Sequence, residues 1–152
     1  MKLAEALLER KSLVQKIETL RARLAENALV QEGDQPSEQP AALMAELNEA
    51  VNQLESLIRR INATNNVARL ADGTAVSDAI VIRDMLKLRR EALEQVAEAA
   101  SMRQARYMRT EVRYVATVNT GELRKQIDGL SKEWRELDAQ IQAVNWMTEL
   151  AA

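Results

Sequence analysis

The sequence predicts a mainly α-helical protein, in which long antiparallel helical hairpins form a coiled-coil-like four-helix bundle with a small β-hairpin and one extra short strand. Composition supports this class, because 29% of residues are charged and 47% hydrophobic, with 4 Gly, 2 Pro and no Phe. The C-terminal stretch supports it as well, since apolar residues recur there at alternating steps of four and three. They are Leu123, Ile127, Leu130, Trp134, Leu137, Ile141 and Val144. Such a narrow stripe predicts a long helix packed lengthwise against other helices.

The first half of the chain predicts one helical hairpin. Helical spacing covers residues 2–31, and a loop at 32–40 contains Gly33 and both prolines, which end the helix. A second helix is expected over 41–65, with a seam of Leu43, Leu47, Val51, Leu54, Ile58 and Ile61. Because the loop between them is short, the two helices should fold back antiparallel.

Residues 66–76 change pattern, with Asp72-Gly73 between two short runs, and predict a β-hairpin whose turn contains a positive φ. Ser77 is a good N-cap for a third helix at 78–106. The expected seam of this helix is Ile82, Leu86, Leu93, Val96 and Ala100.

Residues 111–119 alternate between apolar and polar positions and predict a short strand, followed by a final helix at 121–145. A third helix of this length would separate that strand from the hairpin at 66–76. The strand therefore either returns along the bundle or pairs with the hairpin of a neighbouring chain. The chain is expected to form a single domain over 1–152, and its apolar seams predict a homo-oligomer, a dimer being the commonest case.

The residue types present exclude much common chemistry. There is no His and no Cys, which removes zinc sites of the usual kind, imidazole bases and thiol nucleophiles. Carboxylate pairs such as Asp84 with Glu91, or Glu133 with Glu136, fall on expected helix surfaces beside Lys87 and Lys132. No phosphate-binding or nucleophile-elbow motif occurs. The prediction is therefore a non-enzymatic protein with no catalytic, cofactor or metal site.

Three sets of residues remain as candidates for binding. One is a locally basic stretch that could contact an anion or an acidic partner, although the net charge of −2 gives no general attraction to nucleic acid. A second set of amides beside the expected β segments could line a polar pocket or cap helix ends. The third is a C-terminal pair that could anchor an interface. The sets are Arg103, Arg106, Arg109 and Arg113; Asn62, Asn65, Asn66 and Asn119; and Trp146 with Met147.

The order of certain segments resembles a known family. These are MKLAEALLERK at the start, then INATNN, LADGTAVSDAI, and VRYVATVNTGELRKQIDGLSKEWRELDAQIQ followed by NW. This order is similar to that of short bacterial proteins, common in actinobacteria, that are often labelled septicolysin. The resemblance covers essentially the whole chain and implies membrane lysis, and it brings no catalytic residues.

Three functions are therefore open. The first is a self-associating helical scaffold, the second a membrane-active protein, and the third a small-ligand binder or hydrolase that uses carboxylates and amides. No secretory or transmembrane stretch is evident, because Glu5, Glu9 and Arg10 interrupt the first apolar residues, so a cytoplasmic location is expected.

Overall fold

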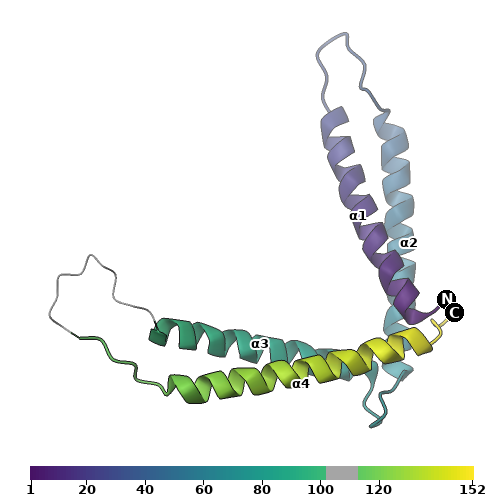
Figure 1. Cartoon of the computed structure of the whole chain (residues 1–152). Helices are drawn as coiled ribbons and strands as arrows, with labels where there is room; N and C mark the ends of the chain where they lie inside the picture. The colour runs from purple at the N-terminus through teal and green to yellow at the C-terminus, as the bar shows by residue number, and fades with distance from the viewer. Residues whose placement is uncertain (102–112) are drawn as a thin grey trace. The chain divides into compact units, whose positions relative to one another are not determined.

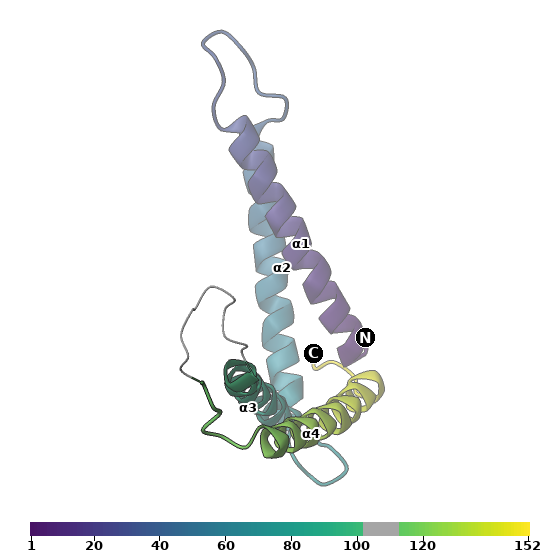
Figure 2. The same cartoon turned by 60° about the vertical axis from the view of Figure 1, so that its left-hand side comes forward.

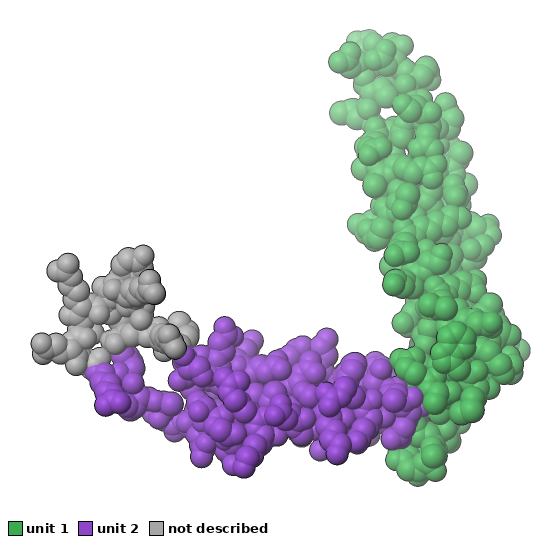
Figure 3. Space-filling model, in the orientation of Figure 1, with its two compact units in different colours: residues 1–75, 142–152 green, residues 76–141 purple. Residues whose placement is uncertain are grey.

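The computed structural model describes residues 1–101 and 113–152. These residues form four helices, α1 (Leu3–Asn27), α2 (Pro40–Val67), α3 (Val76–Ser101) and α4 (Thr120–Met147) (Figure 1). The predicted mainly helical class is confirmed. The chain divides into two compact units, residues 1–75 with 142–152 and residues 76–141, which Figure 3 shows in green and purple.

The first unit is built on the predicted antiparallel hairpin of α1 and α2, which lie side by side in Figures 1 and 2. Two groups of buried side chains hold it together, one toward each end. The first joins the start of α1 to the end of α2 and to the C-terminal tail, and the second joins the end of α1 to the start of α2. They are Leu3, Ala6, Leu13, Leu57, Ile61 and Leu150; and Leu20, Leu43 and Ala50. Burial of these aliphatic groups is the main force that keeps the hairpin closed.

The buried side of α2 differs in part from the predicted seam. Val51 and Ile58 are largely exposed, whereas Ala50 and Leu57, one residue earlier in each case, are buried. Both columns have heptad spacing, so spacing alone could not separate them. Ala50 is buried in a cluster with Leu20 and Leu43, whereas the column of Met44, Val51 and Ile58 is left at the surface.

The segment between α1 and α2 is anchored to the end of α1. Arg23 forms two hydrogen bonds with the Glu38 carboxylate, one from Nε to Oε2 at 2.9 Å and a second from Nη2 to Oε1. Asn27 is buried, and its Oδ1 accepts a hydrogen bond from the Glu38 N–H at 2.9 Å. This anchoring explains why α1 ends at Asn27 instead of residue 31. Pro40 then begins α2, since proline needs no N–H at a first helical position.

The predicted β-hairpin at 66–76 is wrong, although its turn is present. α2 continues to Val67, and the only strand-like pairing in this stretch is a single bridge between Arg69 and Ala75. The Leu70 carbonyl accepts a hydrogen bond from the Gly73 N–H at 3.0 Å, and Gly73 has a φ of 88°. A reversal of this kind is too short for a ladder. α3 begins directly after it, at Val76 and not at residue 78.

The second unit pairs α3 with the part of α4 that precedes residue 142 (Figures 1 and 2). An Arg83 nitrogen near the start of α3 lies 2.8 Å from an Asp138 oxygen near the end of α4, so the two helices run antiparallel. The α4 stripe read from the sequence is confirmed, because each of its seven members is partly or fully buried.

The predicted strand at 111–119 is not formed where the structure describes it. Residues 113–119 are irregular and exposed, and residues 111 and 112 lie outside the described residues, as does any continuation of α3 toward residue 106. The physical reason is a missing partner, since residues 68–75 offer a turn with one bridge and no edge strand for pairing. α4 spans Thr120–Met147, close to the predicted 121–145.

Candidate functional site

α3 carries an exposed apolar stripe that the sequence analysis did not separate from its buried side. The relative exposures are 59% for Val81, 48% for Met85 and 57% for Leu88. Ala92 continues the stripe at helical spacing, and Ile82 and Val96 border it on one side. We call these six residues the α3 stripe. Contiguous exposed aliphatic groups of this extent are typical of interaction surfaces.

The opposite side of α3 packs on α4, so the helix has two distinct faces. Ala79 and Ala97 are buried there, with Arg83, Leu86, Arg90, Leu93 and Ala100 partly buried at steps of three and four. The predicted seam combined the two faces, since Ile82 and Val96 belong to the α3 stripe and Leu86, Leu93 and Ala100 face α4. The sequence signal for two faces was the presence, within residues 76–101, of two columns of apolar residues that each repeat at helical spacing.

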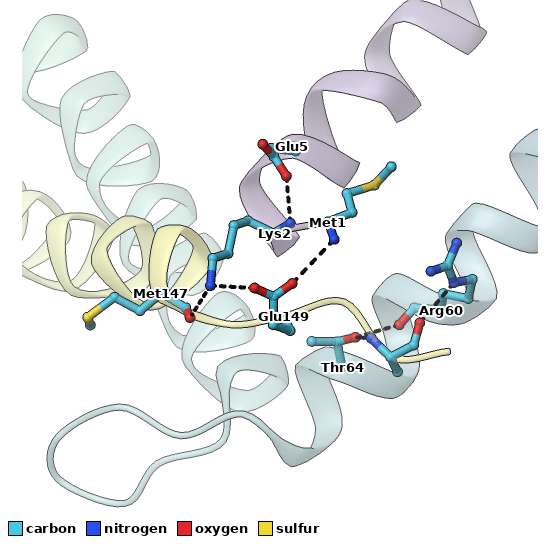
Figure 4. Close-up of polar contacts among 8 residues, drawn as sticks. Met1, Lys2, Glu5, Arg60, Thr64, Met147 and Glu149 are labelled. Atoms are coloured by element: carbon cyan, nitrogen blue, oxygen red, sulfur yellow. Dashed lines mark hydrogen bonds and ion pairs between the residues drawn. The ribbon is translucent and has the colours of Figure 1, made fainter.

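A second feature, which we call the terminal junction, lies within the first unit (Figure 4). It joins residues 148–151 to the start of α1 and to the last turns of α2. The Leu3 N–H donates to the Thr148 carbonyl and the Leu150 N–H donates to the Met1 carbonyl, both at 2.9 Å. Thr64, only 2% exposed, accepts a hydrogen bond on Oγ1 from the Ala151 N–H at 2.9 Å. These bonds hold the tail against both helices of the hairpin.

Charges complete the terminal junction. Lys2 Nζ lies 2.5 Å from Glu149 Oε1, and the Met1 ammonium nitrogen lies 3.3 Å from Glu149 Oε2 (Figure 4). The hydrogen bond from Lys2, followed by that from the Met1 ammonium, lowers the pKa of the Glu149 carboxyl below its ordinary value. Arg60 Nε also donates to the Ala151 carbonyl at 2.8 Å. The junction gave no sequence signal, because its members are more than eighty positions apart.

An open groove of about 710 Å³ lies between α3 and α4 in the second unit. In the part of the chain that the structure describes, its lining combines three carboxylates, one guanidinium and a serine with two apolar residues, namely Glu94, Glu98, Asp128, Arg124, Ser101, Ala97 and Ile127. The Ser101 hydroxyl donates to the Ala97 carbonyl at 2.7 Å, as a helical serine commonly does. Over residues 1–101 and 113–152, no cluster of three carboxylates has the spacing to hold a metal ion.

The predicted binding residues are placed as follows. Arg113 is exposed, and Arg103, Arg106 and Arg109 lie outside the described residues, so the basic stretch stays a prediction. Asn119 Oδ1 accepts a hydrogen bond from the Glu122 N–H at 3.0 Å and so caps α4, which matches the capping alternative for the amides.

The remaining members of those sets lie in the first unit. Asn62 and Asn66 are exposed and Asn65 is partly buried. Trp146 and Met147 are both exposed, at 57% and 70%, which keeps them available for an interface. None of the helices in the described parts of the chain combines the length and the apolarity that crossing a bilayer requires.

Together these features define a protein of helical hairpins with an exposed aliphatic stripe on α3. The chain belongs to the Family of unknown function (DUF6847), whose model matches residues 10–150. It is also similar to a functionally unknown conserved protein from Corynebacterium diphtheriae, with 42% identity, 99% coverage of both chains and a TM-score of 0.94 between the two structures. No curated protein matches the sequence. Neither description mentions septicolysin or lysis, so the resemblance is confirmed only as membership of a family of unknown function.

Proposed function

We propose that this protein is a non-enzymatic helical scaffold that self-associates through the α3 stripe. The single observation that carries the proposal is the exposure of Val81, Met85 and Leu88 in one line on a regular helix. Complete burial of a fully exposed Val, Leu or Met side chain gains about 1.5–3 kcal/mol, and each of these half-exposed side chains would gain about half of that. Water-exposed rows of this kind therefore favour association. The coiled-coil-like seams expected from the sequence would then be completed between copies.

The proposal that the protein is not an enzyme is supported by its residue types and by the groove between α3 and α4. The sequence contains no His and no Cys. Among the described residues that line the groove, Ser101 has the only hydroxyl, and it donates a hydrogen bond to the Ala97 carbonyl of its own helix.

Sedimentation velocity over a micromolar concentration series tests self-association. The wild-type chain should form a dimer or a higher oligomer, and Leu88→Asp should shift it toward monomer, because a carboxylate cannot be buried cheaply in an apolar seam. Leu8→Asp is a matched control, since Leu8 is 61% exposed on α1 and lies outside the α3 stripe. A wild-type protein that stays monomeric throughout the series would overturn the proposal.

Membrane lysis is the alternative that the resemblance to septicolysin-labelled proteins implies. Helices that lie in a bilayer interface usually combine a broad apolar face containing Trp or Phe with a Lys-rich polar face. The α3 stripe is aliphatic, and Asp84 and Glu91 border it, which favours a protein partner. Dye release from anionic liposomes at micromolar protein would establish the alternative.

A further inference from the structure

The charges beside the α3 stripe specify how a second copy would be oriented on it. The α3 helix follows a heptad pattern along the stripe, in which Val81 and Leu88 take d positions and Met85 and Ala92 take a positions. Gln95 at the next d position and Ala99 at the next a position extend this seam, and all six side chains are exposed. Side chains at e and g then border the seam. The g positions are Asp84, Glu91 and Glu98, and the e positions are Ile82, Arg89 and Val96. One border is therefore wholly acidic, and the other is apolar apart from one guanidinium.

An antiparallel pairing of two α3 helices brings g positions against g positions. In every register that keeps the stripes in contact, a carboxylate of Asp84, Glu91 or Glu98 would then face another carboxylate from the same set. Like charges that close together destabilise a helix pair. On the other border, Arg89 would face an e position of the second copy and gain no carboxylate partner.

A parallel pairing brings each g position against the e position five residues later in the other helix. Asp84 of one copy then faces Arg89 of the second copy, and the two-fold symmetry creates this ion pair twice. Glu91 would lie beside Val96 of the second copy, so no carboxylates face each other. Charge complementarity consequently favours the parallel arrangement.

We infer that two copies of this chain associate through a parallel, in-register pairing of their α3 stripes, with Asp84 of each copy paired to Arg89 of the other. The inference rests on the proposed function and adds the partner, the orientation and the register. Small side chains at Ala92 and Ala99 allow the helices to approach closely. Gln95 at a d position can hydrogen-bond to its own counterpart, and polar residues in a seam are known to fix register.

The groups around this ion pair are compatible with it. Asp84 is exposed, and within residues 1–101 and 113–152 its ion pair is with Arg83 of its own helix, at 3.4 Å. Arg83 has a closer partner in Asp138, at 2.8 Å, so Asp84 can turn to a second copy at little cost. Lys87 pairs with Glu91 at 3.8 Å, and Arg90 lies near Glu94 at 3.6 Å.

Disulfide trapping tests the orientation, and the absence of natural cysteines makes single-cysteine variants direct to interpret. Met85→Cys should give a disulfide-linked dimer under mild oxidation, because a parallel in-register seam places each a residue against itself. Lys87→Cys, on the same helix at a c position away from the seam, is the control and should remain unlinked. If instead a mixture of Met85→Cys and Gln95→Cys chains forms the mixed disulfide while Met85→Cys alone does not, the pairing is antiparallel and the inference fails, whereas the proposed self-association stands.

Reversing the charge at Asp84 should change the affinity of the dimer in opposite directions for the parallel and the antiparallel orientation. Asp84→Arg should weaken the parallel dimer about five- to thirtyfold, because two ion pairs are replaced by two repulsions, and adding Arg89→Asp should restore it. In an antiparallel dimer the same Asp84→Arg change would remove a carboxylate contact and tighten association, which would overturn the inference. Glu133→Arg on the exposed surface of α4 is the control for the change in net charge. A chain that never dimerises overturns the inference and the proposed function together.

Discussion

Thr64→Val tests whether the terminal junction stabilises the first unit. The Thr64 hydroxyl donates to the Arg60 carbonyl at 2.8 Å and accepts a hydrogen bond from the Ala151 N–H at 2.9 Å. Valine keeps the shape of the threonine side chain but leaves the Ala151 N–H without its hydrogen-bond acceptor. An unsatisfied buried donor costs about 1–3 kcal/mol, and because Ala151 is only partly buried we expect about 1–2 kcal/mol of lost stability. For a chain of this size, each kcal/mol corresponds to about 2–4 °C in Tm.

Thr19→Val is the matched control for this change. Thr19 also donates its hydroxyl to the carbonyl four residues earlier, that of Gln15 at 3.0 Å, but it is exposed and does not contact the tail. Its free energy of unfolding should stay within about 0.5 kcal/mol of the wild type. Urea unfolding at one fixed protein concentration measures both variants, since association would otherwise change the apparent stability.

Hydrogen exchange adds a local reading of the same change. The Ala151 amide should lose protection in Thr64→Val, because local opening exposes an N–H that has lost its acceptor. The reasoning is refuted if Thr64→Val and Thr19→Val unfold at the same urea concentration and the Ala151 amide keeps its protection.

Three further outcomes are expected. Ile61→Ala removes most of a side chain that is only 1% exposed, and should lower the free energy of unfolding, measured in urea, by about 2–5 kcal/mol. A smaller loss would show that the hairpin collapses around the cavity. Gly73→Ala should cost about 1–2 kcal/mol, because a φ of 88° is unfavourable for a residue with a Cβ. Gly129→Ala inside α4 should instead stabilise the protein, since no atom lies within 4 Å of the new Cβ and alanine favours a helix more than glycine does. Equal effects of the two substitutions on the free energy of unfolding would contradict this reasoning. Hydrogen bonds from Arg23 and Lys2 lower the pKa values of Glu38 and Glu149 in the folded chain. Their stabilising contributions are therefore complete above the ordinary carboxyl pKa of 4.5 and are lost as pH falls below it. Glu149→Gln should consequently make the decrease in Tm from neutral pH to pH values below 4.5 smaller than in the wild type.

The features predicted well from the sequence were those set by local periodicity. The α4 stripe, the α1–α2 hairpin and the turn at Gly73 each follow from residues close together in the chain. The expected strands failed because β structure depends on a partner strand, and a single bridge at Arg69 and Ala75 supplies none.

The candidate surface could be predicted only in part. Spacing identified apolar columns on α2 and α3, but it could not tell Ala50 from Val51 or distinguish the side of α3 that packs on α4 from the side that carries Leu88. Of the interface residues predicted, Trp146 and Met147 are exposed as required, and their partner stays a prediction.

By itself, the sequence determined that the chain forms long helices with narrow apolar stripes, because helical period is a property of neighbouring residues. Only the tertiary structure decided which stripes are buried and which remain in water, since that depends on the face each helix turns to its neighbour. It also decided where the tail is fixed, because the bonds between Thr64 and Ala151 and between Lys2 and Glu149 join residues that only folding brings together.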